Sequence, residues 1–405
     1  MDNVTHSLVG IAFGELWYHF RKGNKKKAGL SRQAAVIASF AGNNVPDLDF
    51  VYASATDAKV GYLIHHRGHT HTMVFGLLFL LLPTLYAKLV KNPKPKITLW
   101  AEGFFVFGLG LWLHILLDSL NSYGVHPFWP LDNHWYYLDT FFILEPLAWV
   151  ALLPALIFAT KHKWLRLSCG VFFFGIVAAT WALPYTSWQA ALLSTGLALA
   201  VWFSHLHKTR ARRFEIGMTV FIGVVLTFFA TGRLVKWQYS KKLAAESPDR
   251  QITDLILTPL PTNPFCWMLI SVERQGTDRY FLRRGVVAAL PSIHPVALCP
   301  AFRNDRGVAP LGEVFESDVR RYSWVGEYKG NLDQLRGLQK SHCYIKAFLE
   351  FARAPFLVDL GDKWQIGDLR FDFRTRLAFS RFSFPKEPTA CPKTDVPWVP
   401  PVNLW

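Results

Sequence analysis

Four short segments that lie far apart in the chain contain most of the histidine and aspartate residues that could bind a metal ion. They are residues 2–6, 44–49, 65–71 and 114–118. Apolar stretches separate these segments, and the connections at the other ends of those stretches are rich in lysine and arginine. If the apolar stretches are helices that cross a membrane, all four segments reach the same face. The sequence therefore predicts one polar site assembled from four distant segments.

His114 and Asp118 are four residues apart at the end of an apolar stretch. This spacing places an imidazole and a carboxylate on one face of a helix, about one turn apart. The pair suits two ligands of one metal ion, or a bridging carboxylate beside a terminal imidazole. A simple hydrogen bond between the two side chains is the alternative. Ionisable groups near a membrane are energetically costly and usually functional, which favours a role in a site.

The segment 65–71 contains four imidazoles in seven residues just before an apolar stretch. His66 and His71 are five residues apart and could bind a metal from the two sides of a turn. His65 and His69 are expected either on the surface or next to the ligands. Arg67 is the strong positive charge of this segment.

The segment 44–49 should end a helix, because Pro46 disfavours helical geometry in the residue before it. Asp47 and Asp49 are two residues apart and would point in opposite directions in an extended segment. One of them can bind a metal while the other hydrogen-bonds a ligand histidine. A plain helix stop is the alternative. His6, in the first turn of the first helix, would face the same site.

The predicted ligand set combines imidazole nitrogens with carboxylate oxygens, which suits zinc, with manganese or iron as alternatives. It exceeds the needs of a single tetrahedral zinc, so one or two ions are expected. Metals so placed activate water for a displacement at phosphorus, with Asp49 as general base and Asp118 as a second catalytic carboxylate. The predicted ligands are His6, Asp47, His66, His71, His114 and Asp118. Further residues expected to support the ligands or line a substrate pocket are Asn44, His65, Arg67, His69, Asn121, His126, His134, Asp139 and Glu145.

The composition indicates a membrane protein. Hydrophobic residues make up 51% of the chain and charged residues only 18%, below the roughly 25% that is usual in soluble domains. Several apolar stretches approach the length of about 20 residues that a spanning helix needs. We expect a bundle of about eight helices, at residues 5–20, 34–45, 72–90, 97–120, 141–160, 165–183, 188–205 and 214–231.

The distribution of charge predicts the orientation of this bundle. Alternate connections (residues 21–32, 88–96, 161–166 and 208–213) hold seventeen Lys and Arg, whereas the opposite connections hold only Lys59 and Arg67. Because positively charged short loops stay in the cytoplasm, the four segments and both termini are expected outside a bacterial inner membrane. The net charge of +15 then needs no nucleic acid as partner, since basic loops face anionic lipids. The start of the chain lacks the cationic region of a cleaved signal peptide, so we expect Met1 to be retained.

After residue 231 the sequence contains no further apolar stretch long enough to span a membrane. We expect a transmembrane domain over residues 1–232, a polar connection, and a β-rich extracytoplasmic domain over residues 245–405. Short strands are predicted at 252–257, 266–273, 279–282, 285–290 and 367–374, with a hairpin partner at 377–384 and a loosely ordered tail from residue 385. An oxidising compartment makes one or two disulfides plausible, although four cysteines allow three pairings. These cysteines are Cys266, Cys299, Cys343 and Cys391.

Together the motifs resemble the YdjM-like family of bacterial inner-membrane proteins, which are described as metal-dependent hydrolases. The resemblance covers roughly residues 1–180. It depends on the opening Met-Asp-Asn-Val-Thr-His, on Pro-Asp-Leu-Asp at 46–49, on His-Arg-Gly-His-Thr-His at 66–71, and on His114 and Asp118 followed by Asn-Ser-Tyr-Gly at 121–124. It implies a hydrolase embedded in the membrane.

The order of these motifs is also similar to that of the zinc-dependent phospholipases C. The resemblance implies a zinc cluster bound by His6, Asp47 or Asp49, His66 or His71, His114 and Asp118. The phospholipases also use an N-terminal amine, which we expect to be unavailable here, and an HxxxE pair that this chain lacks; His126, His134 and Glu145 match that pair only loosely.

The function we expect is hydrolysis of a phosphoester, of a membrane lipid or a lipid-linked substrate, at the outer membrane face. A non-catalytic membrane protein whose His/Asp cluster is structural or stores metal is the alternative. A transporter fits less well, because its ionisable residues should lie near the membrane midplane.

Overall fold

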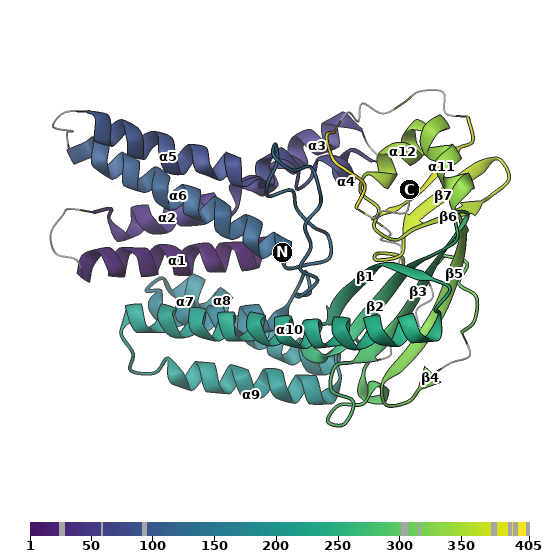
Figure 1. Cartoon of the computed structure of the whole chain (residues 1–405). Helices are drawn as coiled ribbons and strands as arrows, with labels where there is room; N and C mark the ends of the chain where they lie inside the picture. Colours follow the sequence, from purple (N-terminus) through teal and green to yellow (C-terminus); the bar gives the residue numbers. More distant parts are fainter. Residues whose placement is uncertain are drawn as a thin grey trace.

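A helical bundle and a β-rich domain, which lies against one end of the bundle, make up the molecule (Figure 1). The computed structural model describes residues 1–23, 29–57, 60–90, 95–300, 307–314, 317–373, 379–387, 391 and 396–401. Lys59 and parts of the lysine-rich connections 21–32 and 88–96 lie outside the described residues.

All eight predicted helices are present in the bundle. Four helical segments of the described chain are long and apolar enough to cross a membrane, namely Gly61–Leu89, Lys96–Ser119, Lys163–Ala182 and Arg210–Glu246. The number of helices that cross stays a prediction. The bundle helices are α1 (Asn3–Gly23), α2 (Arg32–Gly42), α5 (Met73–Leu89), α6 (Pro95–Ser119), α7 (Pro146–Ala159), α8 (Lys163–Ala182), α9 (Trp188–Ser204) and α10 (Arg210–Glu246).

Short elements connect α2 to α5 on the side of the β-rich domain (Figure 1). Pro46 stands at the start of the first of them, where its missing N–H costs no helical hydrogen bond. These elements are the 3-10 helix η1 (Val45–Asp49), the helices α3 (Phe50–Thr56) and α4 (Gly61–His65), and the 3-10 helix η2 (His69–His71).

Helices α2 and α6 are in close contact, so that the C-terminal end of α2 lies beside α6. A Cβ atom at Gly42 would lie 2.1 Å from the carbonyl oxygen of Phe107, and one at Gly110 would lie 2.7 Å from that of Ser39. Only glycine permits the two backbones to approach this closely. As a result Asn43, the residue after α2, reaches His114 near the C-terminal end of α6.

Helix α10 differs from the prediction. We expected a polar connection after Gly232, but the helix continues to Glu246 and lies along the first strands (Figure 1). The sheet provides a packing surface for this polar part. Phe228 and Gly232 contact the ring of Trp267, and Tyr239 donates a hydrogen bond of 2.7 Å to the carbonyl of Arg321.

A five-stranded antiparallel sheet in the order β1-β2-β3-β5-β4 begins the β-rich domain. The strands predicted at 279–282 and 285–290 are a single strand, β3, whose register shifts between Arg284 and Gly285 opposite β5. Most of β5 was not predicted. The strands are β1 (Gln251–Leu260), β2 (Asn263–Gln275), β3 (Arg279–Ala288), β4 (Ser317–Asp318) and β5 (Tyr322–Asn331).

A second sheet of three antiparallel strands completes the domain. The strand predicted at 367–374 is wrong for residues 369–373, because β7 ends at Asp368 and the chain then turns and becomes irregular; residue 374 lies outside the described residues. Residues 377 and 378 of the predicted hairpin partner lie outside the described residues. The remaining elements are η3 (Val296–Leu298), α11 (Leu332–Ser341), α12 (Cys343–Leu349), β6 (Pro355–Asp359), β7 (Lys363–Asp368) and β8 (Arg381–Pro385).

Two disulfides join the cysteines of this domain, Cys266 to Cys299 and Cys343 to Cys391. The second disulfide holds the C-terminal segment. A loosely ordered tail was expected, but the described part of that segment is packed against the protein. Trp398 is 4% exposed and donates a hydrogen bond of 2.7 Å to the carbonyl of Ile64.

Candidate metal centre

The predicted ligands meet at the end of the bundle that faces the β-rich domain. The start of α1 (where the N-terminus is marked in Figure 1), the end of α2 with η1, the segment η2 and the end of α6 contribute to it. Four side chains come together most closely, with one ligand atom of each within 4.8 Å of all the others. They are Asp47, His71, His114 and Asp118.

The distances within this cluster are short and similar. The Nε2 atoms of His71 and His114 are 3.0 Å apart. Each of them lies 3.5 Å from Asp47 Oδ1 and 3.3 Å from Asp118 Oδ2. Ligand atoms bound tetrahedrally at ~2.0–2.1 Å from a zinc ion would be ~3.3–3.4 Å apart. The four atoms therefore fit around one ion of that size.

The hydrogen bonds behind the two imidazoles determine which ring nitrogen carries a proton. His114 Nδ1 lies 2.9 Å from the carbonyl oxygen of Asn43, which can only accept, so Nδ1 is the donor. His71 Nδ1 lies 3.0 Å from Thr70 Oγ1, whose hydroxyl donates to Asp49, and 3.2 Å from a carboxylate oxygen of Asp49, so Nδ1 is again the donor. In the neutral rings both Nε2 lone pairs then point into the cluster, toward two carboxylate oxygens. Such a set of electron-rich atoms suits a cation.

Asp118 uses its two oxygens on two sides. Oδ2 belongs to the cluster, whereas Oδ1 lies 3.2 Å from His6 Nε2 and in contact with the N-terminal amine of Met1. The amine expected to be unavailable was that of a processed N-terminus; here the amine of Met1 itself contacts Asp118. The ring of His6 stacks on that of His114 at 3.8 Å. His6 thus contacts the centre through Asp118 Oδ1, the oxygen that does not belong to the four-atom cluster.

Asp49 supports the cluster without belonging to it. Its oxygens accept hydrogen bonds from His66 Nδ1 at 2.8 Å, from the backbone N–H of Arg67 at 3.0 Å and from Thr70 Oγ1 at 3.0 Å, besides the contact with His71. Burial alone would raise the pKa of Asp49, but the hydrogen bonds from His66 and His71 hold it below its usual value. Of the two aspartates, Asp47 is therefore the candidate ligand, and Asp49 orients histidines.

His66 was predicted as a ligand, but none of its atoms belongs to the four-atom cluster. Its Nδ1 is bound to Asp49, and its ring lies edge-on to His71, with 5.7 Å between the centroids. The side chain retains some exposure, 10%, whereas His71 and His114 have none. His66 thus lies beside the cluster, in contact with His71, and is more exposed than either imidazole of the cluster.

Arg67 brings a buried positive charge to the centre. Its Nε lies 3.1 Å from Asp118 Oδ2, and its terminal nitrogen donates a bond of 3.0 Å to Asn121 Oδ1. The guanidinium also lies over the ring of Tyr123, 4.6 Å from its centroid. The backbone of Arg67 has a positive φ of 62°, a strained conformation that non-glycine residues adopt mostly where other contacts enforce it.

Asn43 is a site residue that the sequence analysis missed. Its backbone carbonyl accepts from His114 Nδ1, and its side-chain oxygen lies 3.2 Å from His6 Nδ1. One residue therefore orients two of the histidines. Its position directly after α2 and before Asn44 was the only available signal.

The other predicted residues lie around the centre rather than in it. His126 is buried between Trp135 and Trp398, and its burial lowers the pKa of the ring to about 3. Several residues have partners of their own outside the cluster: Asn44 with Ser7, His65 with Tyr52, His69 with Trp129, exposed His134 with Asp132, Asp139 with Arg353, and Glu145 with the backbone of Leu147 and Thr262.

The apolar bundle and this His/Asp cluster define a membrane protein with a site suited to a metal ion. Residues 1–191 match the family described as YdjM inner membrane protein, which confirms the resemblance for this part of the chain. A protein of Bacillus subtilis (strain 168), named as the uncharacterized protein YfhP, is 27% identical over 156 residues. That match covers 38% of this chain and 45% of the Bacillus protein, so less than half of either. No solved structure matches the chain.

Proposed function

We propose that the chain is a membrane-embedded, metal-dependent hydrolase that cleaves a phosphoester of a membrane lipid or lipid-linked substrate. The observation that supports this most directly is the convergence of two imidazole nitrogens, 3.0 Å apart, with two carboxylate oxygens that each lie 3.3–3.5 Å from both nitrogens. Zinc suits this donor set best, and His6 with Asp118 Oδ1 could help to hold a second ion.

A divalent ion in the cluster would supply an activated water and polarise a phosphoryl oxygen. The side chains of the protein supply the acid or base and hold it in position. His66 is the candidate acid or base, because Asp49 holds its Nδ1–H and leaves Nε2 directed away from that bond. From the sequence, Asp49 was expected to be the general base. We assign Asp49 the orientation of His66 and His71 instead, since four donors already surround its two oxygens.

Arg67 has a place in this mechanism beside the ion. A phosphoester brings negative charge to a centre that already contains the carboxylates Asp47 and Asp118. The buried guanidinium of Arg67, 3.1 Å from Asp118 Oδ2, offsets that charge and is positioned to hold a phosphoryl oxygen.

We also propose that the centre faces the extracytoplasmic side. The connection between α9 and α10, with Lys208 and the adjoining Arg210, lies at the far end of the bundle from the β-rich domain (Figure 1), and two disulfides stabilise that domain. Short basic loops stay in the cytoplasm and disulfides persist outside it. Both arguments give the same orientation.

The experiment is metal analysis of the detergent-purified protein together with turnover of phosphodiesters and phospholipids. We expect bound zinc, loss of the metal in His114→Ala, and retention of both metal and activity in His134→Ala, whose ring is exposed. His66→Ala should retain the metal and lose turnover by roughly 10²–10⁴-fold. Metal-bound wild-type protein with no hydrolytic activity would instead support the alternative, a structural or metal-storing cluster.

A further inference from the structure

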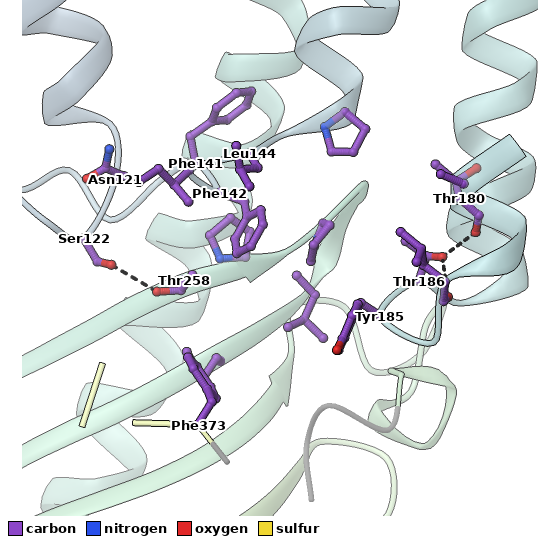
Figure 2. A pocket seen from close by; sticks show the side chains of 18 of the residues that line it. Asn121, Ser122, Phe141, Phe142, Leu144, Thr180, Tyr185, Thr186, Thr258 and Phe373 are labelled. Atoms are coloured by element: carbon purple, nitrogen blue, oxygen red, sulfur yellow. Dashed lines mark hydrogen bonds between the residues drawn. The ribbon is translucent and has the colours of Figure 1, made fainter. Parts of the chain in front are cut away.

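A second feature lies beside the metal centre, a cavity of about 560 Å³ between the bundle and the first sheet. The loop before α7, the end of α8, the connection from α8 to α9, the turn between β1 and β2, and the loop after α6 enclose it, as Figure 2 shows. Its volume lies in the range of ~300–1,000 Å³ that is typical of small-molecule sites.

The walls of this cavity are almost entirely apolar. Phe141, Phe142, Ile176 and Met268 are among the side chains that line it, and the polar groups are few. Two of those are engaged with each other, because Thr258 donates to Ser122 (Figure 2). A wall of this kind binds hydrocarbon rather than a polar metabolite, since an unpaired polar group would lose its hydrogen bonds to water there.

The rim of the cavity is apolar and exposed, at the level where the helices end. Ile143, Leu144 and Leu183 are 39%, 51% and 49% exposed. Leu183 directly follows α8, one of the segments long and apolar enough to cross a membrane. Large exposed apolar groups at the end of such a helix face the lipid phase, so a lipid chain can enter the cavity without passing through water.

One lining residue, Asn121, connects the cavity to the metal centre through Arg67. Asn121 lines the cavity and accepts a hydrogen bond from Arg67, which contacts Asp118. Asn121 is 3% exposed, and within the described part of the chain its Nδ2 group has no hydrogen-bond partner. A buried amide donor without a partner is costly, and an oxygen of a bound ligand would satisfy it.

We propose that this cavity binds the hydrocarbon chain of the substrate lipid, so that the phosphoester next to the chain reaches the metal centre past Asn121. The proposal rests on the proposed function for the position of the head group, whereas the chain site itself does not. Diacyl phospholipids and polyprenyl phosphates share the chemistry that the cavity recognises, an apolar chain joined to a phosphate.

A matched pair of variants tests the proposal in the full-length protein. Ala179 lines the cavity, and its neighbour Ala178 is exposed and does not. Ala179→Phe should lower kcat/KM for a long-chain lipid by about tenfold or more, by filling the chain site, and should leave turnover of a water-soluble phosphodiester unchanged. Ala178→Phe should affect neither. Parallel assays with dioleoyl phosphatidylglycerol and a polyprenyl phosphate identify the chain. An equal loss on all substrates, or no loss on any, would overturn the proposal.

A second measurement does not depend on hydrolysis. Vesicles that contain a phosphatidylglycerol with a diazirine in its acyl chain are photolysed with the wild-type protein, and the cross-linked residues are mapped. We expect adducts on Thr258 and Met268, which line the cavity from β1 and β2, and their loss in Ala179→Phe. Adducts confined to lipid-facing residues such as Leu82 would refute the chain site even if hydrolysis is found. Adducts in the cavity without any hydrolysis would retain the chain site and refute the proposed function.

Discussion

The Nε2 atoms of His71 and His114 lie 3.0 Å apart although the two residues are 43 positions apart in the chain and belong to different elements. Each ring uses its Nδ1–H on an oxygen behind it, the Asn43 carbonyl or the Asp49 carboxylate. Neither neutral ring can then donate to the other. The bundle thus brings together two nitrogens that can only accept. The residues that bind the two Nδ1–H groups therefore determine, together with the ligands, what the site can bind.

Asn43→Ala removes the side-chain oxygen that orients His6 but retains the carbonyl that orients His114. Loss of a residue that orients a ligand typically weakens metal binding by ~10–100-fold. We expect a weakening of this size, measured by competition with a fluorescent zinc chelator. Asn44→Ala is the control, because Asn44 bonds to Ser7 and Phe40 instead. Equal metal affinity in the two variants would contradict a role of Asn43 in the centre.

Glu145 should make stability depend on pH. It is fully buried, accepts from the backbone N–H groups of Leu147 and Thr262, and burial raises its pKa to about 8. A carboxyl with a raised pKa in the folded protein favours folding fully below its unfolded pKa of ~4.5 and loses that contribution as the pH rises through about 8. Glu145→Gln stays neutral and should melt increasingly higher than wild type from pH 5 to pH 9.

Melting temperatures of the two proteins across this pH range provide the measurement. Glu215→Gln is the control, since Glu215 is largely exposed and pairs with Arg212 at the surface. A difference between Glu145→Gln and wild type that is the same at every pH would show that Glu145 is ionised throughout.

The orientation of the bundle can be tested with reporter fusions. A reporter at Lys208, in the connection between α9 and α10, should report the cytoplasm, and one at Gly276, between β2 and β3, should report the opposite compartment. The reason is that α10 lies between the two positions and contains one of the apolar segments long enough to cross. The same compartment for both would disprove the crossing of α10.

The disulfide between Cys343 and Cys391 should stabilise the C-terminal segment. It closes a loop of 48 residues, and disulfides of this kind typically contribute ~2–4 kcal/mol to the free energy of unfolding. Cys343→Ser should therefore melt at a lower temperature and expose the ring of Trp398, which stacks on His126 at 3.8 Å. Tryptophan fluorescence and thermal melts are the measurements. Cys169→Ser, which removes a free thiol, should behave as wild type.

The helices and the convergence of the ligands could be predicted because both follow from local information. Apolar runs of about 20 residues indicate helices, and positions at the ends of alternate helices share a face. The finer roles of Asp49 and His66 could not be predicted, because they depend on the turn at Arg67, whose backbone N–H bonds Asp49. Asn43 was missed for a similar reason, since its carbonyl acts through the contact between α2 and α6.

The β-rich domain was harder to predict because its pairings join distant residues. The alternation at 367–374 indicated a strand with one polar face, yet Asp368, Arg370 and Asp372 are buried. Arg370 bonds to Asp368 at 2.8 Å and to the carbonyl of Ser122, 248 residues earlier. Charged groups that are satisfied by distant partners look, in the sequence, like a face exposed to water.

The length of helix α10 relates the position of the sheet to that of the bundle. Its 37 residues measure about 55 Å, well beyond the ~30 Å of a hydrocarbon core, and it runs without a break from the bundle to the sheet. The height and the rotation of the sheet relative to the bundle therefore depend on this one count of residues as well as on side-chain contacts such as that of Arg370 with Ser122. Inserting a single residue after Gly232 would rotate the following part of α10 by about 100° and shift it by about 1.5 Å. The sheet could then keep either its packing on α10 or the cavity wall that β1 and β2 form beside the metal centre, but not both.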